Sequence, residues 1–226
     1  MTHDNSPTLG RRSLLRLALA GVAGVGLAAC DTPSSSPTAE PSPMPNPSAL
    51  GRQRVLLAYF SRAGENYYNG GRRTLRVGNT EVVAKVVEDA IGCAVYRINA
   101  ADPYSDSYDA TVARNVREQD ADARPQITDP LPSIDQYDII LLGSPIWNVR
   151  PPMIMSTFTE RYDFTGKTVF PLVTYAVSGL GRAPQVYTAS CPGATIGDGL
   201  GVRGEEAAGS VTAVRSWLQR VGLLAR

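Results

Sequence analysis

The chain has 226 residues, and its 22 lysines and arginines against 21 aspartates and glutamates give a formal net charge of +1 at pH 7. Such near-neutrality argues against nucleic acid as a partner, because nucleic acid is recognised through clustered positive charge. The single histidine, His3, lies at the extreme N-terminus, which excludes a histidine-based triad or histidine zinc site in the body of the protein; we assign no catalytic side chain and no metal site, and regard cofactor chemistry as the natural alternative.

Residues 1–29 have the pattern of an export signal. A basic start with Arg11 and Arg12 runs into an apolar stretch, residues 17–29, that is too short to span a bilayer comfortably. The paired arginines followed by Ser-Leu-Leu resemble a twin-arginine signal, although the flanking residues depart from that pattern. Export by the general secretory route therefore stays open.

The apolar stretch ends in Leu27-Ala28-Ala29-Cys30, which resembles a bacterial lipobox. We expect lipidation at Cys30 and a protein anchored to the outer face of the cytoplasmic membrane; a plain secretory signal is the alternative. Residues 30–52 are rich in proline, serine and threonine, so they cannot bury enough apolar surface to fold and are expected to form an extended linker. The remainder, residues 53–226, suits one domain.

The folded part begins with an apolar run at residues 55–60. Because this run shows no polar alternation, it indicates a strand buried on both faces. Over residues 80–91 apolar side chains recur at helical spacing, with a capping residue before them and a glycine after them. These residues predict the first helix, and residues 93–98 predict the second strand.

The middle of the chain continues the alternation. Residues 107–121 are weakly periodic and predict a helix, and residues 138–143 predict the clearest central strand. A Pro-Pro pair opens a third helix within residues 151–158. Residues 167–174 predict a fourth strand, although Pro171 in its middle cannot donate a hydrogen bond to a sheet.

A weak strand at residues 194–196 and a helix over residues 205–221 complete the chain. Strands that alternate with helices imply an α/β fold with three layers, in which a parallel, right-handed, doubly wound sheet lies between helices. In such sheets ligands bind beyond the carboxyl ends of the strands. The predicted buried face of the last helix contains Ala208, Val211, Val214, Trp217, Leu218 and Val221.

The first candidate loop lies between the first strand and the first helix. Ser61 and Arg62 follow the strand, and Gly78, Asn79 and Thr80 open the helix. Hydroxyl groups, glycine and the free N–H groups of a helix N-terminus suit a phosphate. The same residue types also form ordinary helix caps.

The second and third candidate loops follow the third and fourth strands. Trp147 in the second loop offers a flat apolar face, either to a ligand or to the core. Small residues in the third loop let backbone amides approach a ring closely. The candidate residues are Pro145, Ile146, Trp147 and Asn148 in the second loop, and Thr174, Tyr175, Ser178, Gly179 and Gly181 in the third.

Together these segments resemble the flavodoxin-like family, and more closely a bacterial branch with Tyr-Phe-Ser, Gly-Asn-Thr, Pro-Ile-Trp and Ser-Gly-Leu-Gly at matching places. The resemblance implies five parallel strands in the order 2-1-3-4-5 and non-covalently bound FMN. It also implies that Ser61, Arg62, Gly78, Asn79 and Thr80 hold the phosphate. The second and third loops would flank the isoalloxazine on its two sides.

The first loop departs from the family, which has a short Ser-x-Thr/Ser-Gly-Asn-Thr turn there. Residues 63–76 interrupt that turn, and Val77 stands where a phosphate-binding hydroxyl is expected. The insertion is either a lid that supplies a ring stack or a positive charge, or a surface elaboration unrelated to a ligand. The side chains that a lid could use are Tyr67, Tyr68, Arg72 and Arg73.

The family's strand order also bears on the two cysteines of the folded part. It implies that Cys93 and Cys191 lie near opposite edges of the sheet, several strand spacings of about 4.8 Å apart, whereas a disulfide needs Cα atoms within roughly 7 Å. We therefore expect two free, mostly buried thiols. The acidic stretch at residues 102–122 is expected to be a solvated surface rather than a cation site.

The resemblance implies an FMN oxidoreductase that passes electrons or hydride between a reductant and an acceptor such as a quinone. A lipid tether favours a reductase at the membrane over a freely diffusing electron shuttle. Two alternatives stay open: a deazaflavin in place of FMN, and a non-redox binding or assembly module on the same fold.

Overall fold

The computed structural model describes residues 54–225. The predicted export signal at residues 1–29, the lipidation site Cys30 and the linker at residues 30–52 lie outside the described residues. In the part of the chain that the structure describes, no helix is both long and apolar enough to cross a membrane.

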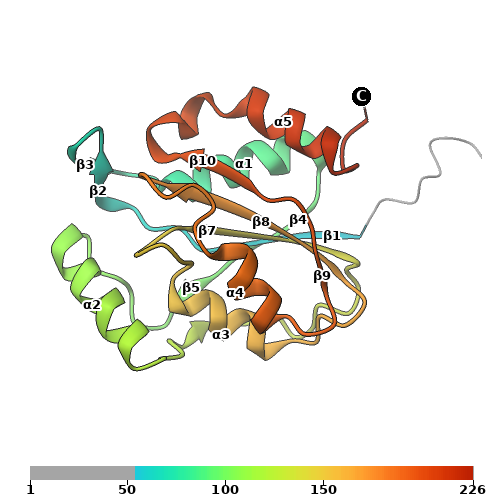
Figure 1. The fold of residues 1–226 in the computed structure, drawn as a ribbon, viewed down its shortest axis with the longest axis horizontal. Coiled ribbons are helices and arrows are strands. Elements are labelled where there is room, and N and C mark those ends of the chain that lie inside the picture. Colours follow the sequence, from blue (N-terminus) through green and yellow to red (C-terminus); the bar gives the residue numbers. More distant parts are fainter. Residues whose placement is uncertain (1–53, 226) are drawn as a thin grey trace, which may run out of the picture. The chain divides into compact units, whose positions relative to one another are not determined.

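A parallel sheet forms the middle of the domain (Figure 1). Its strands follow the order 2-1-3-4-5, which confirms the predicted fold class. The fifth strand is split in two, and both pieces pair with the fourth. From one edge to the other, the strands are β4 (Ala94–Arg97), β1 (Val55–Tyr59), β7 (Ile139–Pro145), β8 (Thr168–Tyr175) and the split pair β9 (Thr195–Ile196) and β10 (Leu200–Arg203).

The split in the fifth strand explains how Pro171 is tolerated inside β8. The N–H groups of Thr195 and Gly197 donate to the carbonyl groups of Lys167 and Val169, both at 2.9 Å. Lys167, just before β8, and Val169 within it therefore face the fifth strand, and Pro171 is next in the same alternation. Opposite Pro171 the fifth strand is interrupted between β9 and β10. No carbonyl group of the fifth strand therefore needs the N–H that proline lacks.

Helices cover both faces of the sheet (Figure 1). On one face α1 (Asn79–Ile91) and α5 (Val211–Arg220) bury their apolar stripes, and on the other face α3 (Met153–Arg161) and α4 (Ala183–Ser190) do the same. Strands β1, β7 and β8 are buried almost throughout. Burial on both faces, as predicted, explains why the sequences of these strands show no polar alternation.

The last helix differs from the prediction at its start. Residues Gly204–Gly209 form a 3₁₀ helix, η2, and α5 begins only at Val211. Because a 3₁₀ helix turns more tightly than an α-helix, Ala207 is buried and Ala208 is exposed. Val211 is also exposed, so the expected buried face is correct only from Val214 onward.

The insertion in the first loop folds as a β-hairpin. Strands β2 (Gly64–Tyr68) and β3 (Gly71–Leu75) pair antiparallel. Asn69 and Gly70 between them have φ values of 46° and 84°, the positive angles that a type I′ turn requires and that Asn-Gly favours. Helix α2 (Tyr108–Asp120) lies at the same end of the domain as this hairpin (Figure 1).

Two shorter strands pair with each other antiparallel: β5 (Asn99–Ala100), which precedes α2 in the sequence, and β6 (Ile127–Thr128), which follows it. Acidic side chains on this part of the surface are exposed, as predicted. Asp102, Asp109 and Asp122 each pair with an arginine. Within the described residues no group of histidine, cysteine and carboxylate side chains could hold a metal ion.

The two cysteines are free thiols, as predicted. Cys93 packs against the apolar core on the α1 and α5 side of the sheet, and Cys191 lies in the core on the other side. Cys191 is buried and Cys93 half-buried. Burial raises the pKa of Cys93 to about 11 and that of Cys191 to about 12.

Candidate functional site

The three candidate loops meet beyond the carboxyl ends of β1, β7 and β8. They surround a hollow of about 100 Å³. This meeting follows from the parallel sheet, since all its strands end at the same edge. Of the predicted residues, the wall contains Ser61, Arg62, Asn79, Thr80, Pro145, Ile146, Trp147, Thr174 and Tyr175.

Helix α1 begins at this hollow with an unusual cap. The residue before the helix is Gly78, which has no side chain to cap it, and the Ser61 Oγ accepts a hydrogen bond from the N–H of Glu81 at 3.1 Å instead. The N–H groups of Asn79 and Thr80 have no partner among the described residues. The helix N-terminus thus presents free donors, together with its positive dipole end, to the hollow.

Gly78 allows the two halves of the first loop to touch. A Cβ atom at this position would lie 2.3 Å from the Ser61 Oγ and 2.5 Å from the Arg62 carbonyl oxygen. Both distances are far below van der Waals contact, so only glycine fits. Gly78 does not line the hollow; it lies behind Ser61 and brings that residue onto the helix.

Two short contacts hold the three loops in register. The hydroxyl groups of Thr80 and Thr174, both buried, are 2.7 Å apart and share a hydrogen bond. The N–H of Ile146 donates to the carbonyl oxygen of Thr174 at 2.8 Å. The start of α1, the end of β7 and the end of β8 are therefore tied together directly at the hollow.

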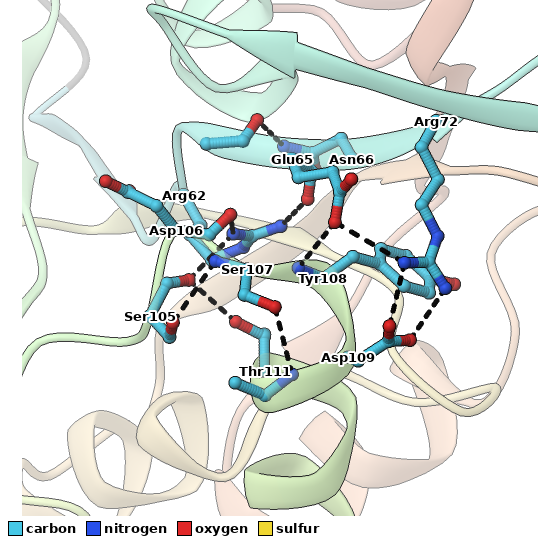
Figure 2. A network of polar contacts seen from close by, with 12 residues as sticks. Arg62, Glu65, Asn66, Arg72, Ser105, Asp106, Ser107, Tyr108, Asp109 and Thr111 are labelled. Atoms are coloured by element: carbon cyan, nitrogen blue, oxygen red, sulfur yellow. Dashed lines mark hydrogen bonds and ion pairs between the residues drawn. The ribbon is translucent and has the colours of Figure 1, made fainter.

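Arg62 is engaged by the protein itself (Figure 2). Its Nη1 donates to the carbonyl oxygens of Ser105 and Asp106 at 2.9 and 3.3 Å, and its Nη2 donates to the carbonyl oxygen of Glu65. Burial lowers the pKa of Arg62. The guanidinium thus joins the hairpin to the loop before α2. Its Nε, which is buried without a partner among the described residues, and the second hydrogen of its Nη2 are left for the expected phosphate contact.

The hairpin forms one wall of the hollow through Asn66 and Tyr67. Figure 2 shows how it is tied to α2: Arg72 on β3 forms two hydrogen bonds with Asp109, at 2.6 and 2.9 Å. At the tip of the hairpin the N–H of Asn69 donates to a carboxylate oxygen of Glu205 in η2 at 2.9 Å. The insertion is therefore part of the wall of the hollow, and its action as a lid on a ligand stays a prediction.

Trp147 is half-buried between the hollow and an aromatic cluster. Its ring meets Phe60 and Tyr104 edge-on, with centroids 5.6 and 5.2 Å apart. Such edge-to-face pairs are favourable and fix the ring orientation. One part of the indole therefore packs against the core while another lines the hollow; its use as a ligand platform stays a prediction.

A tight turn follows Trp147. Asn148 and Val149 have φ values of 50° and 59°, and the N–H of Trp147 donates to the carbonyl oxygen of Arg150 at 2.8 Å. The amide of Asn148 donates to the Gln119 Oε1 on α2 at 2.9 Å and not toward the hollow. A valine in the left-handed region is strained, so α2 and the third loop hold this turn in a conformation that its sequence disfavours.

The glycines of the third loop have a packing role. Gly181 has φ +52°, and a Cβ atom there would lie 2.5 Å from the Val149 carbonyl oxygen. The same oxygen accepts a hydrogen bond from the N–H of Arg182 at 2.7 Å. The third loop thus closes against the second. The predicted residues outside the wall of the hollow are Gly78, Asn148, Ser178, Gly179 and Gly181.

Several residues of the wall were absent from the prediction. Asn66 belongs to the hairpin, for which Asn69-Gly70 was a usable signal; its neighbour Tyr67 had been predicted only as part of a lid. Gly204 follows the fifth strand, where a Cβ atom would lie 2.4 Å from the Asn79 Nδ2; its place at the end of a parallel strand was the available signal. Tyr108 and Ala176 complete the wall.

The wall has two chemically different ends. Hydroxyl groups and free N–H groups gather at the start of α1, whereas Ile146, Trp147 and Tyr175 supply apolar and aromatic surface. Within the described residues the wall has no carboxylate, and its single charged side chain is Arg62. Such a wall suits a ligand with an anionic group at one end and a flat apolar body at the other.

A family model described as flavodoxin matches residues 73–221 of this chain. The comparison with curated proteins found no match to the chain. Two solved structures assigned as flavoproteins are similar. The one from Bacteroides eggerthii has 27% identity and a TM-score of 0.61, with 75% of this chain and 98% of that chain covered. The one from Bacteroides uniformis has 29% identity and a TM-score of 0.58, with 74% and 97% covered.

A flavoprotein of Lactobacillus acidophilus, solved in complex with FMN, has 16% identity and a TM-score of 0.50, with 71% of this chain and 99% of that chain covered. This likeness concerns the fold. The sequence match spans well over half of the chain, and the strand order and the position of the hollow agree with it. The chain belongs to the flavodoxin family.

Proposed function

We propose that the protein binds FMN non-covalently and acts in electron or hydride transfer. The observation that carries the proposal is the wall of the hollow, which joins the free N–H groups of α1 and the Ser61 hydroxyl to the aromatic surface of Trp147 and Tyr175. The two Bacteroides relatives assigned as flavoproteins support it, and the Lactobacillus acidophilus protein shows that a chain of this fold holds FMN.

The residues present fit an anionic flavin. Ser61 and the N–H groups of Asn79 and Thr80 would hold the phosphate. The Ser61 Oγ accepts from Glu81, so its hydroxyl hydrogen stays available to a phosphate oxygen. Ile146 and Trp147 would flank one side of the ring. When bound, FMN supplies reversible transfer of one or two electrons, and the protein excludes water and orients the ring.

The hairpin narrows the hollow. Its volume of about 100 Å³ is below the ~300–1,000 Å³ typical of small-molecule sites, and Tyr67 and Asn66 lie in its wall. We infer that the hairpin moves outward when FMN enters, or that part of the ring projects beyond the wall. The contacts of Arg72 with Asp109 and of Asn69 with Glu205 are exposed, so they contribute little to stability and can open.

We further propose that this reaction takes place at the outer face of the cytoplasmic membrane, with quinone-type acceptors. The lipobox-like segment that ends at Cys30 supports this location. A lipid tether restricts the domain to acceptors in or near the bilayer, which favours an apolar acceptor over a soluble protein partner.

A flavin titration tests the proposal. The purified protein is expected to be yellow, to release FMN on denaturation, and to rebind it. Trp147→Ala should weaken FMN binding about tenfold, because one aromatic contact is lost, whereas Trp147→Phe should retain most of the affinity. Tyr68→Ala is the control, since Tyr68 lies on the hairpin but outside the wall.

The small hollow and the engaged Arg62 favour one other candidate, a binding module for a smaller anion without redox work. The same titration separates the two. A colourless protein that takes up neither FMN nor a deazaflavin, but whose melting temperature rises with inorganic phosphate, would replace the flavin proposal with this one.

A further inference from the structure

A second hollow, the α2 groove, lies between α2 and the turn after Trp147. It has a volume of about 330 Å³, within the range of small-molecule sites. It adjoins the first hollow, and the two share part of their walls. The shared residues are Arg62, Asn66, Tyr108, Ile146 and Trp147.

The groove has an apolar rim on a helix that is otherwise polar. Val112 and Val116, one turn apart on α2, line it and are 43% and 41% exposed. Ile146 and Trp147 form the opposite side. Exposed apolar side chains that gather around a concave site mark binding surfaces more often than isolated ones do. Within the described residues Arg62 is the only charged side chain in the wall, and its Nη groups are already bonded to carbonyl oxygens.

One buried amide lies between the two valines. Asn115 is only 3% exposed, and its Oδ1 accepts a hydrogen bond from the Gln119 Nε2 at 3.1 Å. The same Nε2 donates to the carbonyl oxygen of Trp147 at 3.2 Å. This pair of bonds fixes the Asn115 amide and leaves its Nδ2 without a partner among the described residues. The groove therefore contains a donor that these two bonds hold in place and that is free to bind a ligand.

We propose that the α2 groove is the binding site for the electron acceptor, an uncharged, planar carbonyl compound of the quinone class. The Asn115 Nδ2 donates to a carbonyl oxygen of the acceptor, and the valines and Trp147 pack on its ring. The inference rests on the proposed flavin function. Reduction of a quinone to its quinol takes two electrons and two protons, and a dihydroflavin gives up two of each, so the exchange balances without another reactant.

The charge of the wall sets the acceptor class. A nucleotide or an acidic peptide would need several free cationic groups, whereas the described residues of the groove include one cation, Arg62, whose Nη groups already donate to carbonyl oxygens. A quinone needs apolar contact and one donor, and the groove offers both.

Quenching of tryptophan fluorescence by 2-methyl-1,4-naphthoquinone tests the site in flavin-free protein. The chain has two tryptophans; Trp147 lines the groove, whereas Trp217 is fully buried in the core on the other side of the sheet. We expect saturable quenching. Val116→Glu should weaken it about tenfold by placing a charge against the acceptor, and Val211→Glu, at a 49% exposed position on α5, should leave it unchanged.

The same variants then report on the reaction. Protein loaded with FMN and reduced by light is mixed with the naphthoquinone, and the return of flavin absorbance is followed. Val116→Glu should slow this return about tenfold, with Val112→Glu acting in the same direction. Equal quenching in wild type and Val116→Glu would overturn the proposal, as would a parallel loss of FMN affinity, because the groove would then belong to the flavin site.

Failure of the flavin function has a different signature. In that case neither the wild type nor any variant takes up FMN. The quenching experiment, which uses flavin-free protein, still decides whether the α2 groove binds the quinone.

Discussion

Replacing Gly78 with alanine tests the geometry on which the candidate site depends. Gly78 has φ −70°, which any residue can adopt, so the substitution introduces no backbone strain. The new Cβ would lie 2.3 Å from the Ser61 Oγ and 2.5 Å from the Arg62 carbonyl oxygen. One of these atoms belongs to the backbone, so the loop after β1 must move away from α1 to make room.

The expected cost follows from those distances. Overpacking of this kind costs about 1–3 kcal/mol, which includes the loss of the Ser61 cap on α1, itself worth about 1 kcal/mol. For a domain of this size each kcal/mol lowers the melting temperature by roughly 2–4 °C. We therefore expect Gly78→Ala to melt about 2–12 °C below the wild type and to bind FMN more weakly, since Ser61 and the N-terminus of α1 separate.

Circular dichroism melts and a flavin titration measure both effects. Gly209→Ala is the matched control, because a Cβ atom there would meet nothing within 4 Å; it should be neutral or stabilise by roughly 0.4–1 kcal/mol. A Gly78→Ala protein that melts with the wild type and binds FMN equally well would refute the close contact between the loop and the helix.

Three further predictions concern other parts of the domain. Val149→Gly should stabilise the protein by about 1 kcal/mol by relieving a left-handed valine; a lower melting temperature would contradict this. The hydrogen bond from Arg72 holds the pKa of Asp109 below its ordinary 3.8, so this attachment of the hairpin is complete above that pH and is lost as the pH falls through the lower folded-state value; the protection factors for amide exchange in β2 and β3 should fall as the pH is lowered below 3.8, and less so in Arg72→Ala. Burial raises the pKa of Cys93 to about 11 and of Cys191 to about 12, so a disulfide reagent at about pH 8 should react much more slowly with the native than with the unfolded protein; equal rates would show that the thiols are accessible.

The sheet was predictable because its physical cause is visible in the sequence. The runs that became β1, β7 and β8 lack polar alternation, and only burial on both faces explains that pattern. The carboxyl ends of those strands then placed Ser61, Trp147 and Tyr175 at one edge without any knowledge of contacts. Pro171 looked like a conflict because the break in its neighbouring strand cannot be inferred from β8 alone.

The elements that were missed depend on tertiary context. Helix α4 is short, contains a proline and buries only two residues, Ala183 and Tyr187, so its apolar periodicity is weak. The hairpin had a local signal in Asn69-Gly70, but its place in the wall follows from bonds to α2 and η2. Arg62 shows the limit of sequence-based prediction most clearly. Its position after β1 indicates a positive charge beside a phosphate site, but the sequence does not reveal that backbone carbonyl groups bind its guanidinium.

A crystal structure of the protein grown with FMN tests the central claim most directly. The phosphate is expected within hydrogen-bonding distance of the Ser61 Oγ and the N–H groups of Asn79 and Thr80, with the ring against Trp147. FMN bound elsewhere, or a hollow that stays closed by Tyr67 at saturating FMN, would contradict it.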